Sequence, residues 1–575
     1  MVAETMAARS SPAPAFGYRK RRTIELFLLL IGQSIGWAGY MLTTLDQTNT
    51  PPPGWETVTG VWFAAGIVIH LVVRFRLPYA DPIIVPIAFA LTGLGLAQIH
   101  RIDLIEPVTT AAHTQALAVA IGLVCFIVVA FVIREPRRLR AYPFILSAIG
   151  IALLLMPLLP GIGVEANGSR IWIDIAGFSF QPAEIAKIIL AASFAGYLAE
   201  HRDVLSVAGK NFLGLNLPRA RDLGPIAVMW GVSLAILVFQ NDLGTSLMFF
   251  GLFVMMIYVA TGKGSWVLLG GVLFAGAAVA AYHFAGHARR RFDFWLHPFD
   301  YPDDATQIIG AQFGLSHGGL FGSGWGLGRP DLTIFASTDM IAAALGEEMG
   351  VIGLMGIIVL YALFVFRGLR TALGSRDPFL TLFAGGLSFV FAIQVFAIIG
   401  GVTRLLPLTG LTTPFLSQGG SSMIANWILV GVLAVVSHQA RRPHAAAGET
   451  TDEGVTDFED DMTQVIPEKQ LRRIGIGATQ PVAAFDADQV PVAAAGESGP
   501  LRSAQGGAGS ANGPSRSLGG ASSVASPARS VSSPSFSPVS ASSPSLGPSF
   551  SGEEPTQVVD GRWVPDPPQR GGADD

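Results

Sequence analysis

The chain has 575 residues, of which 50% are hydrophobic and only 14% are charged, and its mean hydropathy is +0.49. A soluble domain carries about 25% charged residues, so this composition excludes an ordinary soluble protein and favours a membrane protein with many spans. The net charge of −4 carries little information, nothing indicates a nucleic-acid partner, and the single cysteine, Cys125, excludes an internal disulfide and a thiolate metal cluster.

About twelve apolar segments approach the roughly 20 residues that a helix needs to cross a bilayer. No small-residue cleavage site follows the first segment, so we expect no cleaved signal peptide. The predicted fold is an all-α polytopic membrane protein. Its predicted spans are 24–44, 57–73, 80–99, 112–133, 142–160, 180–199, 224–240, 243–261, 265–284, 340–366, 378–402 and 418–438.

The distribution of arginine and lysine predicts the orientation of these spans. Residues 1–23 end in the basic run 19–22 and should be cytoplasmic, because cytoplasmic connections are enriched in basic residues. Alternating spans then place most arginines in cytoplasmic connections. The predicted protein therefore sits in the cytoplasmic membrane with both termini in the cytoplasm, a membrane domain at 24–440 and a large outer loop at 285–338.

The first outer connection with chemical interest contains Arg170 beside Trp172, followed by Glu184 and Lys187. Arg170 is expected either as an interface anchor or as a cation for a phosphate headgroup. Glu184 and Lys187 are three residues apart and share one helical face, where a plain interfacial ion pair is the alternative to a role in binding. In the next outer turn, Asp242 is placed to cap the following helix.

The polar loop at 285–338 interrupts two long apolar regions. Arg289 and Arg291 are the two ends of a cationic patch. The forked guanidinium group of arginine fits the oxygens of a phosphate. Asp300 and Asp303 follow, and then Gln307. Glycines between 318 and 328 permit close backbone approach to a ligand, and Asp339 ends the region. A solvated surface and a flexible loop are the alternatives for the carboxylates and the glycines.

Two further sets of polar residues occur in the last part of the membrane domain, one inside a predicted span and one in the last outer loop. Glu347 and Glu348 are adjacent inside an apolar segment, so at least one needs a partner, a cavity or a proton, for structure or for catalysis. The last outer loop contains Arg404 and leads to Ser421 and Ser422. Its hydroxyls, glycines and arginine predict a headgroup pocket at the membrane surface.

Residues 441–575 are rich in Ser, Pro, Gly and Ala and cannot bury enough apolar surface to fold. We expect a disordered cytoplasmic tail. Acidic residues precede Thr-Gln-Val at Thr463 and again at Thr556. Chance repetition is one explanation. The other is a pair of phosphothreonine sites bound by a phosphothreonine-binding protein.

Several of these segments, in this order, resemble the family of shape, elongation, division and sporulation proteins (SEDS), which includes RodA, FtsW and SpoVE. The resemblance covers roughly residues 80–440. The form of the last outer loop, together with two extra N-terminal spans, is most similar to actinobacterial RodA. The motifs that carry it are Asn167-Gly168-Ser169-Arg170 with Trp172, Gln181-Pro182-Ala183-Glu184 with Lys187, Asp242-Leu243-Gly244-Thr245, Thr338-Asp339 with Gly346-Glu347-Glu348, and Pro407-Leu408-Thr409-Gly410 with Ser417-Gln418-Gly419-Gly420-Ser421-Ser422.

The resemblance implies a peptidoglycan glycosyltransferase that polymerises lipid II at the outer face of the cytoplasmic membrane for cell elongation. It also implies a class B penicillin-binding protein as the transpeptidase partner, and a catalytic aspartate in the large outer loop. Asp300 is the first candidate and Asp303 the second. Arginines, or a divalent cation such as Mg or Mn, would neutralise the departing pyrophosphate.

Three alternatives stay open at this point. A lipid II flippase would share the membrane architecture, and an FtsW-like division polymerase would share the reaction. A non-catalytic scaffold is the third, because His297-Pro298 stands where relatives read Asn-Pro or Asp-Pro, and Tyr301-Pro302 stands where they read Asp-Pro.

Overall fold

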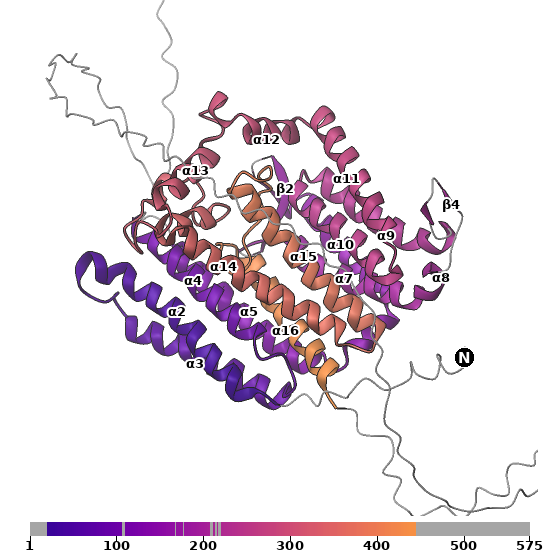
Figure 1. Cartoon of the computed structure of the whole chain (residues 1–575), viewed down its shortest axis with the longest axis horizontal. Coiled ribbons are helices and arrows are strands. Elements are labelled where there is room, and N and C mark those ends of the chain that lie inside the picture. Colours follow the sequence, from indigo (N-terminus) through magenta and orange to yellow (C-terminus); the bar gives the residue numbers. More distant parts are fainter. Residues whose placement is uncertain are drawn as a thin grey trace, which may run out of the picture. The chain divides into compact units, whose positions relative to one another are not determined.

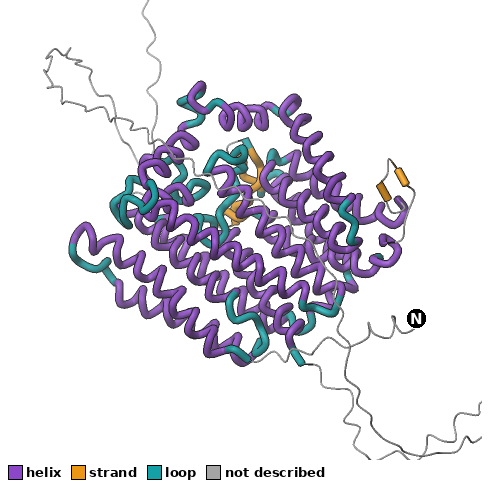
Figure 2. The backbone as a smooth tube through the Cα atoms, in the orientation of Figure 1, coloured by secondary structure: helices purple, strands orange, loops and turns teal. Residues whose placement is uncertain are grey.

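The computed structural model describes residues 20–105, 110–166, 168–175, 178–206, 211–212, 215–216 and 220–443. These residues are mostly helical, and strands are confined to short segments (Figure 2). Thr463, Thr556 and the rest of the predicted tail beyond residue 443 lie outside the described residues, as do residues 1–19 and Asn167. The predicted domain boundaries at 23 and 440 stay predictions, although the described helices run from Arg22 to Arg441.

The predicted all-α membrane fold is confirmed, and each of the twelve predicted spans coincides with a helical segment. Among the described residues, ten helices are long and apolar enough to cross a membrane, and two apolar helices, Pro143–Leu158 and Leu223–Phe239, are shorter. The long helices are α2 (Arg22–Thr48), α3 (Trp55–Arg76), α4 (Ile84–Ile105), α5 (Ala111–Val132), α7 (Pro182–Glu200), α10 (Leu243–Thr261), α11 (Ser265–Phe284), α14 (Ile341–Leu373), α15 (Pro378–Val402) and α16 (Gly420–Arg441).

The remaining elements are mostly shorter, although α9 has 20 residues. The remaining helices are η1 (Pro136–Ala141), α6 (Pro143–Leu155), η2 (Met156–Leu158), α8 (Arg202–Ser206), α9 (Ala220–Phe239), α12 (Gly286–Leu296), η3 (Pro298–Asp300), α13 (Thr306–Gly318) and η4 (Pro330–Leu332). The strands are β1 (Gly163–Ala166), β2 (Ser169–Ile175), β3 (Phe178–Phe180), β4 (Asn211–Phe212) and β5 (Leu215–Asn216). β1, β2 and β3 form one antiparallel sheet in that order, with Val164 opposite Trp172, and β4 pairs with β5.

The core is built around α4, α7 and α16. In their most apolar stretches, 89%, 89% and 83% of the residues are buried, whereas the corresponding figure for α11 is 6%. α2 packs against α3 and α4 at one edge of the bundle, and α11 packs against α10 and α12 (Figure 1). α5 and α15 carry apolar residues on all of their own faces, as expected for helices that face either lipid or other helices.

Both ends of the helical region meet at one short loop, between α3 and α4. The Arg22 guanidinium donates to the Ala80 carbonyl oxygen, and Arg441 forms an ion pair with Asp81, which also binds Arg367. The start of α2 and the end of α16 therefore lie at the same end of the bundle. This agrees with an even number of crossings.

Helix α14 is interrupted next to its two glutamates. Gly350 has φ 69° and ψ −175°, which only glycine adopts readily. The interruption leaves backbone carbonyl groups without their hydrogen bonds inside the helix. The glycine-rich loop at 318–324 donates hydrogen bonds to them instead. Ser323 and Gly324 donate their N–H groups to the carbonyls of Glu347 and Glu348 at 2.9 and 3.1 Å. Irregular backbone of this kind is tolerated at membrane depth where protein surrounds it.

Replacing Gly350 tests this interruption. Gly350→Ala is expected to destabilise the protein by about 3 kcal/mol, because the backbone conformation excludes a side chain and a Cβ would overlap the Gly322 backbone nitrogen. Gly356→Ala is the matched control on the same helix, since a Cβ there meets nothing within 4 Å and alanine favours helix. Thermal unfolding in detergent measures both. Equal midpoints for the two variants would contradict the interpretation.

Candidate active site

Helix α12 is fixed to the last outer loop by hydrogen bonds between side chains and backbone. Arg291 Nη1 donates to the Leu408 carbonyl at 2.9 Å. Trp295 Nε1 donates to the Arg404 carbonyl at 2.9 Å, and Arg404 Nε donates back to the Trp295 carbonyl at 3.2 Å. The Arg404 guanidinium thus lies at the C-terminal end of α12, where a cation is favoured. In this structure, Arg291 and Arg404 position α12.

The two candidate bases follow directly after α12. Asp300 ends η3 and Asp303 lies in the next turn, and both residues are exposed. The segment is anchored beside them, because Pro298 is buried and the Tyr301 ring lies 5.6 Å from the Phe294 ring of α12. The fixed helix therefore determines where these carboxylates stand.

Arg291 of α12 interacts electrostatically with two carboxylates, Asp242 and Asp339. Burial raises the pKa of Asp339 to about 6, and the positive charge of Arg291 opposes that rise. Burial also raises the pKa of Asp242, against hydrogen bonds from Thr245. Asp242 caps α10, accepting the Thr245 N–H at 2.9 Å. Burial lowers the pKa of Arg291, while Asp339 and Asp242 raise it, so one arginine serves two carboxylates.

The raised pKa of Asp339 predicts a dependence of stability on pH. Its ordinary value is 3.8, so between about pH 4 and pH 6 the folded protein holds a proton that the unfolded chain has lost. The free energy of unfolding should therefore fall, by about 1–3 kcal/mol, as pH rises through this window. Asp339→Asn should remove this part of the fall. Thermal unfolding between pH 4 and pH 7 measures the difference, and a difference between variant and parent that stays constant with pH would contradict it.

Glu184 and Lys187 form a buried ion pair. Lys187 Nζ donates to Glu184 Oε2 at 2.5 Å and to Gln394 Oε1 at 3.1 Å, and the lysine side chain is 1% exposed. Gln394 Nε2 in turn donates to the Thr412 carbonyl at 3.0 Å. Lys187, which the sequence suggested as a substrate ligand, thus joins α7 to α15 and, through Gln394, to the last outer loop.

The remaining predicted residues occupy separate places. Arg170 pairs with Glu165 at 2.9 Å on the exposed β1–β2 hairpin, on the same sheet as Trp172. Arg289 is exposed, 3.8 Å from Asp293, and lies over the Tyr282 ring. Gln307 is partly buried in the first turn of α13.

The two serines and two glutamates of the last spans are buried. Ser422 Oγ accepts hydrogen bonds from Thr412 at 2.8 Å and from Asn426 at 3.2 Å, and Ser421 lies beside it. Glu347 Oε1 accepts the Arg329 N–H at 2.9 Å. Glu348 lies 3.5 Å from the Arg101 guanidinium. Glu347 thus has a hydrogen-bond partner, whereas Glu348 is buried beside the Arg101 guanidinium without a hydrogen bond to either carboxylate oxygen among the described residues.

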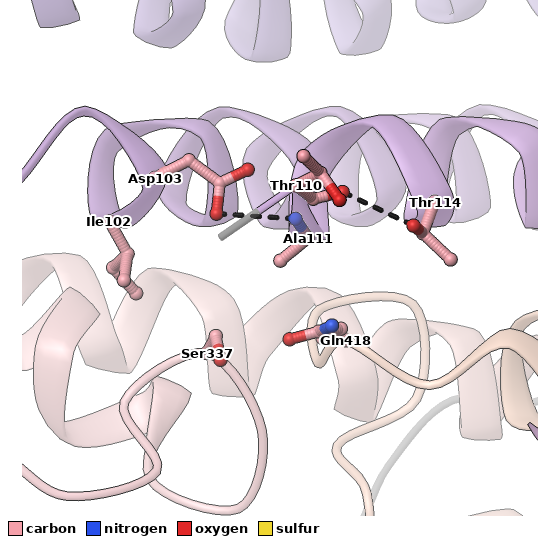
Figure 3. A pocket seen from close by; sticks show the side chains of 7 residues that line it. All are labelled: Ile102, Asp103, Thr110, Ala111, Thr114, Ser337 and Gln418. Atoms are coloured by element: carbon pink, nitrogen blue, oxygen red, sulfur yellow. Dashed lines mark hydrogen bonds between the residues drawn. The ribbon is translucent and has the colours of Figure 1, made fainter. Parts of the chain in front are cut away.

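A small polar cavity of about 170 Å³ lies between the ends of α4 and α5 and two loops. Figure 3 shows Ser337 and Gln418 facing the α4 and α5 residues across it. Asp103 accepts the N–H groups of Ala111 and Ala112 at 3.3 and 2.8 Å and so caps α5. Two hydrogen bonds join the two loops. The Gln418 N–H donates to the Ser337 carbonyl at 2.8 Å, and Ser417 Oγ donates to the Thr338 carbonyl at 2.6 Å, one residue before Asp339.

The described residues do not provide an evident metal site. Within them, no group of three or more His, Cys, Asp or Glu side chains is placed to hold an ion. Asp242 and Asp339 share Arg291 instead. No step is assigned to a divalent cation.

Sequence reasoning missed several residues that build this region. Gln394, Trp295 and Gln312 each connect distant segments, and Gln312 Nε2 donates to the Val402 carbonyl at 2.9 Å. The sequence offered only a weak signal for these three residues. A glutamine within the apolar run of α15 is unusual, but its partner lies 207 residues away along the chain.

Comparison with known proteins identifies the family. The model of the FtsW, RodA and SpoVE family, described as "Cell cycle protein", matches residues 83–442, which is more than half of the chain. The chain belongs to this family. The predicted resemblance is therefore confirmed, and the protein is a multi-pass membrane protein of the FtsW/RodA/SpoVE family.

Individual relatives of this family cover most of the membrane domain. The peptidoglycan glycosyltransferase RodA of Mycobacterium tuberculosis (strain ATCC 25618 / H37Rv) is 44% identical over 432 residues, covering 74% of this chain and 92% of that protein. Stage V sporulation protein E of Bacillus subtilis (strain 168) is 32% identical over 370 residues, covering 63% and 98%.

A solved structure also shares the fold. It is described as "Structural coordination of polymerization and crosslinking by a peptidoglycan synthase complex", is 24% identical, covers 63% of this chain and 99% of its own, and gives a TM-score of 0.51.

Proposed function

We propose that this protein is a peptidoglycan glycosyltransferase that polymerises lipid II, in the manner of RodA and for cell elongation. The observation that carries the proposal is the 44% identity to a protein named peptidoglycan glycosyltransferase RodA, extending over 92% of its length. The arrangement of exposed carboxylates and arginines around α12 supports it, because glycosyl transfer to a hydroxyl needs a base and positive charge for the leaving group.

The orientation belongs to the same proposal. Connections at the end that holds Arg22 and Arg441 carry most of the basic residues, so we assign this end to the cytoplasm. The segment after α12 and the Glu184–Lys187 pair then lie toward the outer face. Lipid II presented on that face would meet Asp300 and Asp303 directly.

In the proposed reaction, Asp300 removes the proton from the 4-hydroxyl of the acceptor sugar. Asp303 is the second candidate for this role. The hydroxyl oxygen attacks the anomeric carbon of the lipid-linked donor, and the bond to undecaprenyl pyrophosphate breaks with inversion. The pyrophosphate takes the electron pair. Exposed Arg289 and Arg170 are available to bind its oxygens.

Other predicted residues hold the segments around this site in place. Arg291 and Arg404 hold α12 in position, and Asp242 and Asp339 flank Arg291 electrostatically. Gln307 lies four residues after Asp303 and is available to a bound sugar. Ser421 and Ser422 are buried, so their proposed contribution is to shape the last outer loop.

The proposed partner is a class B penicillin-binding protein, which would cross-link the new glycan strand. The related solved structure is a peptidoglycan synthase complex, described as coordinating polymerisation and crosslinking. That description supports a partner for this chain as well. Separately, we propose that a phosphothreonine-binding protein recognises Thr463 or Thr556. Both threonines lie outside the described residues.

A flippase remains the second candidate, and the distribution of charge argues against it. In the part of the chain that the structure describes, the buried Asp, Glu, Lys and Arg side chains gather toward the two ends of the spans. They are Arg22, Glu25, Asp81 and Arg441 on one side and Arg101, Glu184, Lys187, Asp242, Glu347 and Glu348 on the other. A transporter for a charged headgroup needs polar groups along the path. Charge at the two ends favours chemistry at a surface.

One experiment separates the two functions. The purified full chain is reconstituted in liposomes with fluorescently labelled lipid II. The proposal predicts glycan polymer on electrophoresis, with no more labelled lipid crossing the bilayer than in empty liposomes. Labelled lipid that becomes accessible to dithionite without polymer would support the flippase instead.

A further inference from the structure

A second cavity lies at the opposite end of the bundle from the candidate site. It has a volume of about 790 Å³ and lies among the ends of α3, α5 and α16 and the segment 133–137. Arg76, Arg134, Arg137 and Arg442 contribute to its lining. Nothing in the proposed polymerisation uses these residues.

The charge of this cavity is strongly positive. Its lining contains one carboxylate, Glu135, and that group already accepts a hydrogen bond from Arg138 at 2.8 Å outside the lining. Arg137 pairs with Asp377 at 3.3 Å. Within the described ranges, Arg76, Arg134 and Arg442 form no ion pair with a carboxylate. Three arginines therefore face a shared space without an anionic partner from the described part of the chain.

The rest of the lining is mixed, with His438 and Gln439 beside several apolar residues. Leu77, Ala130, Ile133 and Val435 line the same cavity, and Ile133 and Val435 lie near the ends of the spanning helices α5 and α16. The cavity thus combines apolar side chains near the ends of α5 and α16 with a cluster of guanidinium groups. Arginine forks match phosphate oxygens, and basic pockets between helix ends on the cytoplasmic side suit anionic lipid headgroups.

We propose that this cavity binds an anionic phospholipid, with the phosphate held by Arg76, Arg134 and Arg442 and the start of an acyl chain against the partly exposed Ile133. The apolar side chains favour a lipid over a soluble anion or an acidic peptide. The bound lipid would hold the end of α16, from which the chain continues to its C-terminal segment. This site is independent of the proposed polymerisation.

The test uses the purified full chain in detergent with added dioleoylphosphatidylglycerol or dioleoylphosphatidylcholine. Native mass spectrometry counts retained lipid, and thermal unfolding measures protection. We expect retention and protection with phosphatidylglycerol only. The double variant Arg134→Gln/Arg442→Gln should bind it roughly 20- to 30-fold more weakly, since each basic residue near an anionic lipid contributes about fivefold. Both arginines are exposed, so the variant should fold.

A matched control removes the same charge elsewhere at this end. Arg202→Gln/Arg370→Gln changes two exposed arginines outside the lining, neither of them paired with a lining residue, and should leave binding unchanged. An equal loss in both double variants would overturn the proposal in favour of general attraction to charge. Equal protection by inorganic phosphate, or displacement of the lipid by a peptide of residues 449–461, which is rich in acidic residues, would overturn the choice of a lipid as occupant.

Discussion

Asp300→Ala is expected to lower the rate of lipid II polymerisation by about 10²–10⁴-fold, the contribution of a well-placed general base. Asp300 is exposed at the end of η3, and its position is fixed by α12, which two arginines and a tryptophan bind to the last outer loop. The substitution removes the base without disturbing that anchoring. Glycan product from the purified variant, measured as an initial rate, gives the effect.

Neighbouring carboxylates supply the comparison. Asp303→Ala should have the large effect if Asp303, the second candidate, is the base, and Asp300→Ala should then have a small one. Asp304→Ala is the matched control, because Asp304 is exposed in the same turn and has no assigned role. Full activity in both Asp300→Ala and Asp303→Ala would end this assignment.

Glu184→Gln is expected to destabilise the protein by about 3–5 kcal/mol, the second large effect. Lys187 is 1% exposed, and without the Glu184 carboxylate its ammonium would remain buried, with Gln394 Oε1 as its one hydrogen-bond acceptor among the described residues. The thermal unfolding midpoint in a fixed detergent measures the change. The double variant Glu184→Gln/Lys187→Met should recover much of the loss, because it removes the unpaired charge.

An exposed ion pair provides the control for this substitution. Glu165→Gln makes the same chemical change in the Arg170 pair, where both side chains are more than half exposed. Such pairs contribute about 0–1 kcal/mol, so the unfolding midpoint should hardly move. Similar losses for Glu165→Gln and Glu184→Gln would show that burial does not determine the effect.

The membrane fold was largely predictable, because spanning helices follow from local apolar runs. The helices inside the predicted outer loop were harder to see. Residues 285–338 contain α12 and α13, whose polar composition resembles that of a loop. The interruption of α14 at Gly350 had no local signal, since the loop at 318–324 that stabilises it lies earlier in the chain.

The candidate site was predictable only in its local parts. Residue spacing placed Glu184 beside Lys187, and the structure shows that pair. Their connection to Gln394 depends on the packing of α7 against α15. In the same way, adjacency suggested that Arg289 and Arg291 act together, but α12 exposes Arg289 and turns Arg291 toward Leu408. The sequence contains no signal for which face of α12 meets the last outer loop.

The most direct test of the proposed function is lipid II polymerisation by the purified full chain, alone and with its class B penicillin-binding protein. The proposed function predicts glycan strands in both reactions, dependent on Asp300 or Asp303, and cross-linked strands only when the partner is present. Absence of polymer in both reactions would contradict it, provided that a thermal unfolding transition shows the purified protein to be folded.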